Sequence, residues 1–320
     1  SLNNQFMDAV QYSDELKIEL PRIRANSVIG IVPISSGCLS QCTFCSVKQI
    51  KGNLKSYPLL SIIHDINIAI NNGCKEIWLT SQDNGCYGFD INTNLAELLG
   101  YVIKIDGEFM VRIGMASPQH LINYLDELIH VLKSEKIFKF IHLPVQSGNE
   151  QILKKMRREY DVSTFKAVIK NIRDAIPKLT LSTDVICGFP TETEEQFDDT
   201  LRLIVDITPD IVNISRYQAR PYTLSAKMPQ LSGEELKNRT RKLTKLFNVV
   251  ALQQNRKWID WQGRIIIDEV GKNNTFIGRN YAYKPVVVCG EFKLGEIVHV
   301  KINDMTSYDL RGEVVNSDKL

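Results

Sequence analysis

The chain has 320 residues, of which 43% are hydrophobic and 24% are charged, and this balance is ordinary for a water-soluble globular protein. No apolar stretch approaches the ~20 residues of a membrane-spanning helix, and no signal-peptide pattern is present, so we expect a cytoplasmic protein that does not bind membranes. The formal net charge of +2 excludes a strong general attraction to nucleic acid, although basic residues are concentrated at 154–173 and 233–257.

Six short apolar runs alternate with helical patterns over most of the chain. Strands are predicted at 29–34, 76–80, 109–114, 138–143, 179–187 and 211–215. Helices are predicted at 61–72, 121–133, 161–176 and 192–206, where apolar residues recur at helical spacing. Six β-α repeats predict an α/β fold with a parallel sheet, built as an open partial (β/α)6 barrel. Functional groups in such folds lie at the carboxyl ends of the strands.

The pattern changes after residue 232. A long basic amphipathic helix is predicted from Ser232 to about Trp258, and short β-rich runs follow it at 264–270, 285–289, 297–302 and 310–315. Their spacing predicts a small antiparallel β-barrel of about sixty residues. We therefore divide the chain into a linker remnant (1–24), a core (25–232), a basic linker helix (233–260) and the small barrel (261–320).

Three cysteines, Cys38, Cys42 and Cys45, stand close together in the loop after the first predicted strand. Three thiolates can hold three irons of a 4Fe–4S cluster and leave the fourth iron open. A structural zinc site usually closes with four ligands, and this loop has no fourth ligand nearby. Disulfides fit poorly, because the chain has an odd number of seven cysteines and no mark of secretion. We favour the open cluster and keep zinc as the alternative.

The spacing C-x-x-x-C-x-x-C, with an aromatic residue before the last cysteine, resembles the signature of the radical S-adenosylmethionine (SAM) enzymes. Phrases at later strand ends resemble, in their order, the methylthiotransferases of that superfamily, which insert a methylthio group into tRNA adenosines or a ribosomal protein. Segments 51–58 and 112–115 favour the branch that acts on threonylcarbamoyladenosine next to the anticodon. The phrases are Ser81-Gln82-Asp83, His142 through Ser147, Met156 with Arg158 and Tyr160, Thr183 through Pro190, and Arg220-Pro221 with Thr223. The resemblance covers about residues 24–315, and its last part resembles the RNA-binding TRAM domain.

This resemblance implies that Cys38, Cys42 and Cys45 ligate the catalytic cluster and that SAM chelates its open iron. One electron from a flavodoxin- or ferredoxin-type donor would then give a 5′-deoxyadenosyl radical, which activates adenine C2 for transfer of a methylated sulfur. Arg158 is expected to pair with the SAM carboxylate, although phosphate binding or a solvated helix face would also explain it. The residues expected around SAM are Phe44, Ser81, Gln82, Gln146, Ser147, Arg158, Ile186, Gly188 and Tyr217.

Binding of tRNA is expected at the rim of the core and on the small barrel. Arg216 and Arg220 suit phosphates or the threonylcarbamoyl carboxylate, because guanidinium groups match both anions. Asp83 and Asp184 are expected to serve as hydrogen-bond anchors near the substrate. For the barrel to bind RNA, its cations would have to form a one-sided patch that includes Arg264, Arg279 and Lys284. The alternative is a solvated surface of mixed charge that does not bind RNA.

The sequence departs from the family pattern at Lys51, where arginine is usual, and at Thr191 and Tyr222, where glycine is usual. A larger departure is an absence. The family has an N-terminal domain with three more cysteines that hold an auxiliary 4Fe–4S cluster, the sulfur donor. We expect a fragment without that domain or a protein that lost it, and a monomer. Cys74 and Cys289 are expected to pack inertly, and Cys86 and Cys187 are alternative ligands at the rim.

Two other functions stay open at this point. One is a different radical SAM reaction, on a ribosomal protein. The other is a non-catalytic RNA-binding protein held together by zinc.

Overall fold

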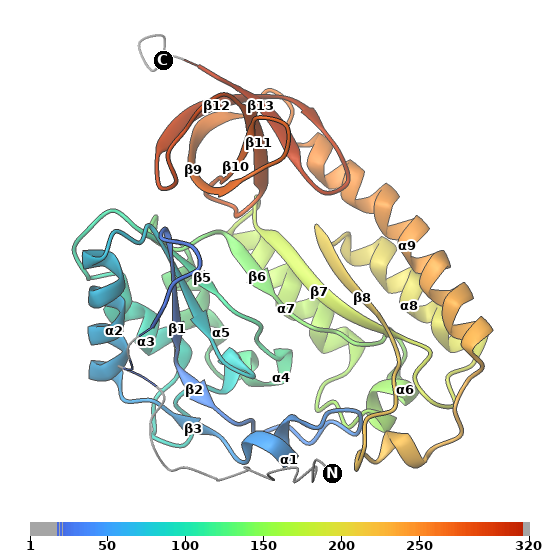
Figure 1. The fold of residues 1–320 in the computed structure, drawn as a ribbon. Coiled ribbons are helices and arrows are strands. Elements are labelled where there is room, and N and C mark those ends of the chain that lie inside the picture. The colour runs from blue at the N-terminus through green and yellow to red at the C-terminus, as the bar shows by residue number, and fades with distance from the viewer. Residues whose placement is uncertain (1–17, 19, 21, 316–320) are drawn as a thin grey trace, which may run out of the picture.

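The computed structural model describes residues 18, 20 and 22–315, so most of the predicted linker remnant at 1–24 lies outside the described residues. Its core is a set of six parallel strands in two three-stranded sheets (Figure 1). The first sheet has the order β1 (Ile29–Pro33), β4 (Glu76–Thr80), β5 (Met110–Ile113). The second has the order β6 (Phe140–His142), β7 (Thr180–Cys187), β8 (Ile211–Arg216).

The two sheets are joined between β5 and β6. The amide of Val111 donates to the carbonyl of Lys136 at 2.7 Å, and the amide of Ala116 donates to the carbonyl of His142 at 3.0 Å. The strands therefore form one open array, and all six predicted strands are present. The predicted α/β fold, an open six-stranded radical SAM type of barrel, is confirmed.

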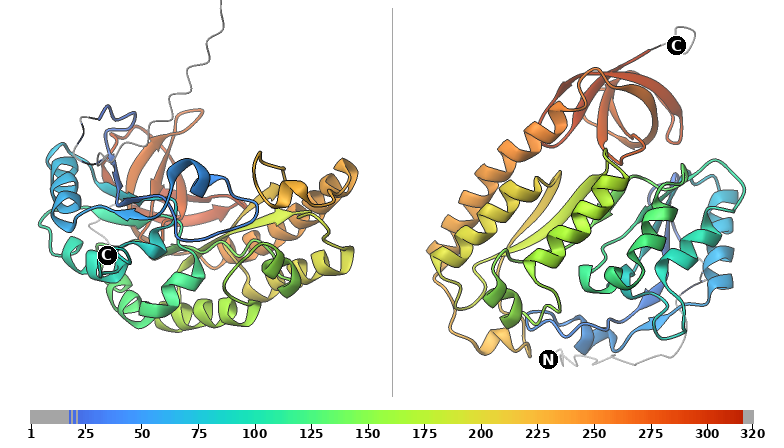
Figure 2. Two further views of the ribbon diagram at one scale, coloured as in Figure 1. Left: turned by 90° about the horizontal axis from the view of Figure 1, so that it is seen from below. Right: turned by 180° about the vertical axis from the view of Figure 1, so that it is seen from behind.

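Helices cover one face of this array, as the view from behind shows (Figure 2). Strand residues alternate between the two faces, so Ile77 and Leu79 of β4 enter the main hydrophobic core while Trp78 points to the other side. We call the side opposite the helices the inner face. The helices between the strands are α2 (Leu59–Asn71), α3 (Leu95–Val102), α4 (Pro118–Leu121), α5 (Leu125–Leu132), α6 (Glu150–Lys155), α7 (Val162–Ala175) and α8 (Glu194–Ile207).

Some helix predictions need correction. The helix expected at 121–133 is interrupted by the 3-10 turn Ile122–Tyr124, because Tyr124 leaves helical geometry and its hydroxyl donates to the Gly85 carbonyl at 2.6 Å. Helix α2 begins at Leu59 after Pro58, two residues before the predicted start. Helices α3, α6 and the short α1 (Val47–Lys51) were not predicted. The remaining short elements are β2 (Ser35–Ser36), β3 (Lys55–Ser56), η1 (Asn84–Cys86) and η3 (Ser225–Lys227).

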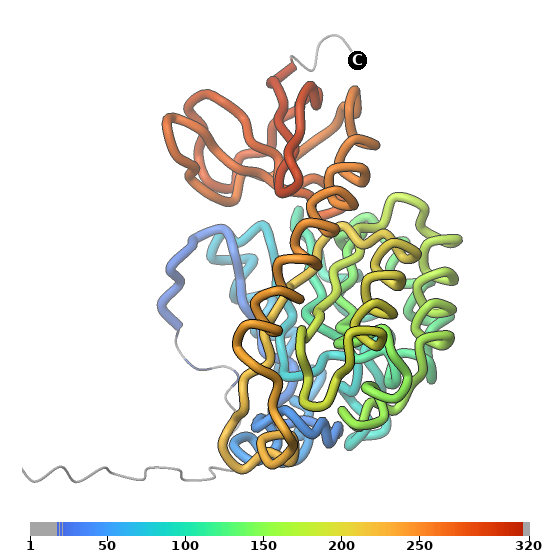
Figure 3. Tube along the Cα trace, turned by 90° about the vertical axis from the view of Figure 1, so that its right-hand side faces the viewer, coloured from blue at the N-terminus to red at the C-terminus, as the bar shows by residue number. Residues whose placement is uncertain are grey.

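The predicted long helix is α9 (Gly233–Arg256), which starts with a capping box between Ser232 and Glu235. It runs along the core to a closed five-stranded barrel (Figure 3). The barrel strands are β9 (Gln262–Val270), β10 (Thr275–Arg279), β11 (Pro285–Cys289), β12 (Ile297–Met305) and β13 (Leu310–Val314). Strand β10 was not predicted, and the barrel is mixed because β11 and β13 pair in parallel, so the expectation of a wholly antiparallel barrel was wrong.

The barrel docks on the amino ends of the core strands. The amide of Lys139, just before β6, donates to the Tyr281 carbonyl at 2.8 Å, and Lys284 reaches Asp210, just before β8, at 2.6 Å. The cysteine loop follows β1 at the carboxyl ends of the strands, at the opposite end of the core (Figure 1).

Tyr283 of the barrel closes the amino end of the inner face. Its ring lies 4.9 Å from the ring of Phe138 and 5.2 Å from that of Phe140, and the Arg112 guanidinium lies over it at 5.3 Å. Aromatic contacts of this kind add to the free energy of burying the ring. Among the described residues, no helix is both long and apolar enough to cross a lipid bilayer.

We expect Tyr283→Ala to lower the free energy of unfolding by about 3 kcal/mol, because it empties a buried aromatic site. Thermal and urea denaturation would measure the loss. Tyr308→Ala is the matched control, because Tyr308 is 67% exposed, and it should change stability little. Equal stability of the two variants would contradict a closing role for Tyr283.

Stability should also depend on Glu76, which lies beside the docked barrel. Burial, and next the nearby Asp268, raise the pKa of Glu76 to about 7, while Trp78, Arg279 and Arg112 act against this rise. The folded state then binds the proton more tightly than the unfolded state, so stability falls as pH rises from about 4.5 to about 7. We expect Glu76→Gln to remove about 3 kcal/mol of this fall, at about 1.4 kcal/mol per pKa unit. Urea denaturation of both proteins across this pH range would measure it; parallel curves would contradict it.

Candidate active site

The cysteine loop is held between distant parts of the core. The Thr43 amide donates to the Met156 carbonyl at 3.1 Å, and the Thr43 carbonyl accepts from the Ser225 amide at 3.0 Å. Gly37 has φ +75°, and a Cβ there would lie 1.9 Å from the Asn53 carbonyl oxygen, so only glycine fits. These contacts fix the loop before any ligand binds.

The three cysteines, Cys38, Cys42 and Cys45, line one cavity of about 110 Å³. Tetrahedral ligands of a single zinc ion would hold their sulfur atoms about 3.8 Å apart, since each Zn–S bond is about 2.3 Å. Among the described residues, only Asp83, Cys86 and His120 bring three metal-ligating atoms within 4.8 Å of one another. The three thiol sulfurs are therefore not gathered at zinc-ligand spacing in this structure, and three cysteines in one loop fit three irons of an iron–sulfur cluster.

The electrostatics of the loop are mixed. Burial raises the pKa of the Cys38 and Cys45 thiols, which opposes thiolate formation without a metal. Arg220 and Arg158 act against the rise in the pKa of Cys45, and Arg158 Nη1 also donates to Cys42 Sγ at 3.2 Å. A cation that donates to a ligating sulfur stabilises negative charge there.

Four of the residues expected around SAM line the same cavity, namely Phe44, Gln82, Gln146 and Arg158. Gln146 has φ +71°, a backbone conformation that is unusual for residues other than glycine. Ser81 Oγ and Gln82 Oε1 are buried and have no hydrogen-bond partner among the described residues. Unpartnered buried polar atoms are costly, so the cavity fits a polar ligand that supplies a partner to Gln82, which lines it, whereas Ser81 does not line it.

Arg158 does not lie on a solvated helix face. It is buried, and its Nε donates to the Tyr160 hydroxyl at 3.2 Å. Tyr160 in turn donates to the Val145 carbonyl at 2.9 Å. The segment that contains Met156, Arg158 and Tyr160 therefore packs against the cysteine loop and stabilises it.

Other residues expected around SAM lie elsewhere. Ser147 is fully buried against Thr200 and accepts from the Asn149 amide at 3.2 Å, so its hydroxyl is used within the fold. Gly188 faces α9, because a Cβ there would lie 2.0 Å from Leu236 Cδ2. Tyr217 is buried and donates to Ser225 Oγ at 2.8 Å. None of these three residues lines the cysteine cavity, so their expected contacts with SAM stay predictions that the cavity does not support.

Ile186 lies next to the cavity without lining it. It packs with Phe44 in a small apolar cluster that includes Met156 and Phe189. The Phe44 and Phe189 rings meet edge to face at 6.5 Å. Ile186 therefore supports the loop rather than the ligand directly.

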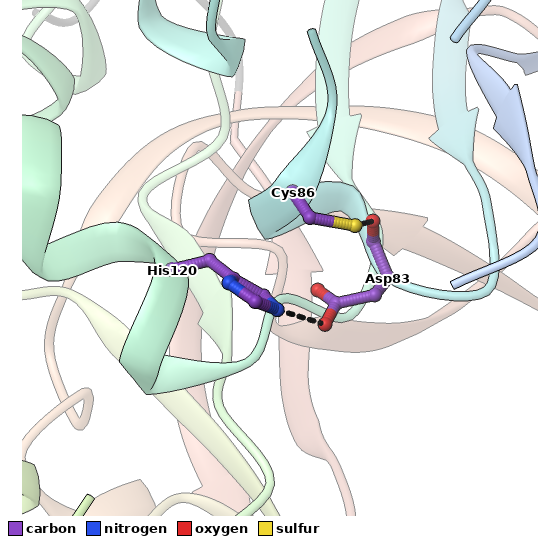
Figure 4. A group of neighbouring side chains, drawn as sticks. All are labelled: Asp83, Cys86 and His120. Carbon is purple, nitrogen blue, oxygen red and sulfur yellow. Dashed lines mark hydrogen bonds and ion pairs between the residues drawn. The ribbon is translucent and has the colours of Figure 1, made fainter. Parts of the chain in front are cut away.

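Behind the loop lies a buried group of Asp83, Cys86 and His120 (Figure 4). Asp83 Oδ1 accepts from the Ser117 amide at 2.9 Å, while Oδ2 faces His120 Nε2 at 3.5 Å. His120 also lies 3.3 Å from Ser40 Oγ, within the cysteine loop. Asp83 therefore links three loops as an anchor, and sequence reasoning missed His120.

The two alternative ligands do not join the cysteine cavity. Cys86 is fully buried and donates to the Asp83 carbonyl at 3.3 Å, and Cys187 is fully buried in the main core. Burial raises the pKa of Cys86, and raises that of Cys187 to about 12, so both stay thiols. Cys74 is buried as expected, whereas Cys289 is exposed.

The predicted tRNA-binding cations divide into two groups. Arg216 is exposed at the end of β8, and Arg220 is exposed beyond it. Arg220 lies near the cysteine loop, because its charge acts against the rise in the pKa of Cys45. On the barrel, Lys284 is buried and bound to Asp210, and Arg279 is bound to Asp268 at 2.8 Å. Arg264 is half-exposed but paired with Glu108 at 2.5 Å. The pairing of Arg279 and Lys284 gives the predicted barrel patch no support, and the patch stays a prediction.

Two departures from the family pattern share one backbone feature. Thr191 has φ +67° and Tyr222 has φ +64°, conformations that favour glycine. Thr191 accepts from Lys155 Nζ at 2.6 Å, whereas Tyr222 is 89% exposed. Lys51 is exposed at the end of α1. None of the three changes the cysteine cavity.

Comparison with known proteins agrees with this geometry. Residues 32–204 match the radical SAM superfamily model, and residues 263–315 match the TRAM domain model. A relative from Pyrococcus horikoshii, named "Probable threonylcarbamoyladenosine tRNA methylthiotransferase", is 43% identical over 299 residues, which are 93% of this chain and 70% of the relative. The chain belongs to the family of radical SAM tRNA methylthiotransferases.

Two further comparisons extend this result. The human threonylcarbamoyladenosine tRNA methylthiotransferase is 34% identical over 306 residues, which cover 95% of this chain and 53% of the human protein. The structure of coproporphyrinogen III oxidase from Escherichia coli, a radical SAM enzyme, superposes with a TM-score of 0.53 at 13% identity and covers 87% of this chain and 67% of that one. The second likeness concerns the fold alone. Membership of the radical SAM superfamily implies a 4Fe–4S cluster and SAM as cofactors.

We expect Cys42→Ala to lose most of the iron and the visible absorption that anaerobic reconstitution gives the wild type, because one of three ligands is gone. Iron analysis and absorption spectroscopy would measure this. Cys86→Ala is the matched control, since this buried thiol lies next to the loop, and it should keep wild-type iron content. Full iron in Cys42→Ala, or loss in Cys86→Ala alone, would contradict the assignment.

Proposed function

We propose that this chain catalyses the radical SAM step that places a methylthio group on C2 of N6-threonylcarbamoyladenosine in tRNA. The main support for this function is that three free cysteines line one cavity together with Gln82, Gln146 and Arg158. It occurs in a chain whose Pyrococcus horikoshii relative carries the corresponding name and is similar over 93% of this chain.

The chain's own residues would divide the work as follows. Cys38, Cys42 and Cys45 hold three irons, and Arg158 offsets negative charge at the Cys42 sulfur. When bound, the cluster and SAM together supply one-electron cleavage of a carbon–sulfur bond and so a group that abstracts hydrogen. Gln82 and Gln146 offer amide groups to the polar parts of SAM, and Phe44 offers an apolar surface. The protein thus binds, orients and excludes water.

The sulfur that is transferred needs a separate source. The four cysteines outside the loop do not assemble a second site: Cys74, Cys86 and Cys187 are buried and Cys289 is exposed. We propose that the sulfur comes from an auxiliary 4Fe–4S cluster held by cysteines other than the seven of this sequence. We also retain a flavodoxin- or ferredoxin-type electron donor, a monomeric state and a cytoplasmic location as predictions.

The cations available to tRNA support its approach from the carboxyl ends of the strands. Arg216 and Arg220 are exposed there, and their guanidinium groups have no hydrogen-bond or ion-pair partner among the described residues. Arg279 and Lys284 of the barrel are engaged with Asp268 and Asp210 at the other end. We propose that phosphates next to the target nucleotide contact the first pair.

The proposed function is tested by anaerobic reconstitution with iron and sulfide, followed by reduction in the presence of SAM. About four irons per chain and release of 5′-deoxyadenosine are expected for the open cluster. Nucleoside mass spectrometry of tRNA from a deletion strain should show threonylcarbamoyladenosine without its methylthio group. One zinc per chain and no SAM cleavage would instead support the non-catalytic alternative.

We expect Arg216→Ala and Arg220→Ala each to weaken tRNA binding and to reduce the slope of log affinity against log salt by about one. Fluorescence anisotropy over a salt series would measure both. Arg202→Ala is the matched control, because Arg202 is exposed on the outer helix α8, and its slope should equal that of the wild type. Unchanged slopes in all three variants would contradict the proposed contacts.

A further inference from the structure

A polar group on the inner face includes Asp184, which was predicted from the sequence only as a hydrogen-bond anchor. It consists of His142 on β6, Asp184 on β7 and Asn213 on β8, which are adjacent strands of the second sheet. His142 Nε2 and Asn213 Nδ2 each lie 2.7 Å from the same oxygen, Asp184 Oδ1. The side chains are partly open to solvent, with His142 15% and Asp184 27% exposed.

This group lies midway between the closed amino end and the cysteine cavity. On β6, His142 follows by two residues Phe140, which packs against the Tyr283 ring. On β7, Asp184 precedes by two residues Ile186, which packs with Phe44 of the cysteine loop. Two residues of a strand span about 6.6 Å and return to the same face. A base inserted from the carboxyl end would therefore meet this group next to the cavity.

The backbone also couples the group to the cavity. The Asp184 carbonyl accepts from the Gln146 amide at 2.8 Å, and the Gln146 carbonyl accepts from the Ile186 amide at 3.0 Å. Gln146 itself lines the cysteine cavity. A ligand that spans from the cavity to Asp184 would thus meet a surface of fixed shape.

The hydrogen bonds determine what this surface offers. Oδ1 of Asp184 accepts from two donors, while no donor among the described residues reaches Oδ2. Asn213 donates through its amide nitrogen, so Asp184 Oδ2 and the Asn213 amide oxygen are two acceptors without a donor among the described residues. Such acceptors complement a ligand edge with N–H donors.

We propose that Oδ2 of Asp184 accepts a hydrogen bond from the N–H of the carbamoyl group on adenine N6, with His142 and Asn213 holding the carboxylate in place. This inference rests on the proposed function and names the residue that recognises its substrate. A carbamoylated adenine presents a urea N–H, which a carboxylate oxygen accepts strongly. The carboxylate also repels anions, so the threonyl carboxylate and the phosphates are directed toward the exposed Arg216 and Arg220.

The test compares binding of two anticodon stem-loop RNAs, one with threonylcarbamoyladenosine and one with unmodified adenosine at the same position. For the wild-type chain, fluorescence anisotropy should give tighter binding of the modified RNA. Asp184→Asn keeps the shape but replaces an acceptor with a donor, and we expect about a tenfold loss of affinity for the modified RNA and little change for the other. Asn213→Ala should give a smaller loss, because the carboxylate keeps one of two donors.

Asp126→Asn is the matched control, because it removes the same charge from the exposed first turn of α5. Its binding should equal that of the wild type. Circular dichroism and the visible absorption of the reconstituted cluster verify that each variant is folded. Wild-type preference retained in Asp184→Asn would overturn this inference and leave the proposed function intact. Absence of any preference in the wild type would overturn the proposed substrate, and this inference with it.

Discussion

Both faces of a parallel sheet must be covered, and this requirement organises the whole molecule. Helices cover one face, but the inner face is covered only at its two ends. At the amino end, Tyr283 of the barrel packs on Phe138 and Phe140. At the carboxyl end, Phe44 of the cysteine loop packs on Phe189. The strip between them carries the partly exposed side chains of His142 and Asp184, so the proposed substrate site follows from incomplete coverage of this face.

The loop at the carboxyl end depends on Arg158. This buried guanidinium touches the Cys42 sulfur and the Tyr160 hydroxyl at once, so it joins the ligand loop to the segment after α6. A buried cation needs nearby negative charge, and a thiolate needs a nearby cation. Metal binding satisfies both requirements together. The apo loop, in which burial raises the pKa of Cys38 and Cys45, is therefore less favourable electrostatically than the loaded one.

The sequence predicted features that depend on local pattern and missed those that depend on distant partners. The six core strands were predictable because buried parallel strands are continuous apolar runs, and the cysteine loop because ligand spacing is local. Strand β10 was missed although it is as long as β13, which also contains a glycine and was predicted. Lys284 was predicted to bind RNA because the sequence shows its charge but not its ion-pair partner. That partner, Asp210, lies far away in sequence. The contact of Ser147 with Thr200 on α8 was missed for the same reason, because these two residues also lie far apart in sequence.

The docking of the barrel decides which cations remain for RNA. The ion pairs of Lys284 with Asp210 and of Arg279 with Asp268 are buried, and a buried pair loses much of its stabilisation when either partner turns to another ligand. Phosphate contacts by Lys284 would therefore require undocking of the barrel, and those by Arg279 would require breaking an ion pair within the barrel. Exposed cations such as Arg216 and Arg220 carry no such cost. We therefore favour phosphate contacts at the opposite end of the core, where the exposed Arg220 lies near the cysteine loop.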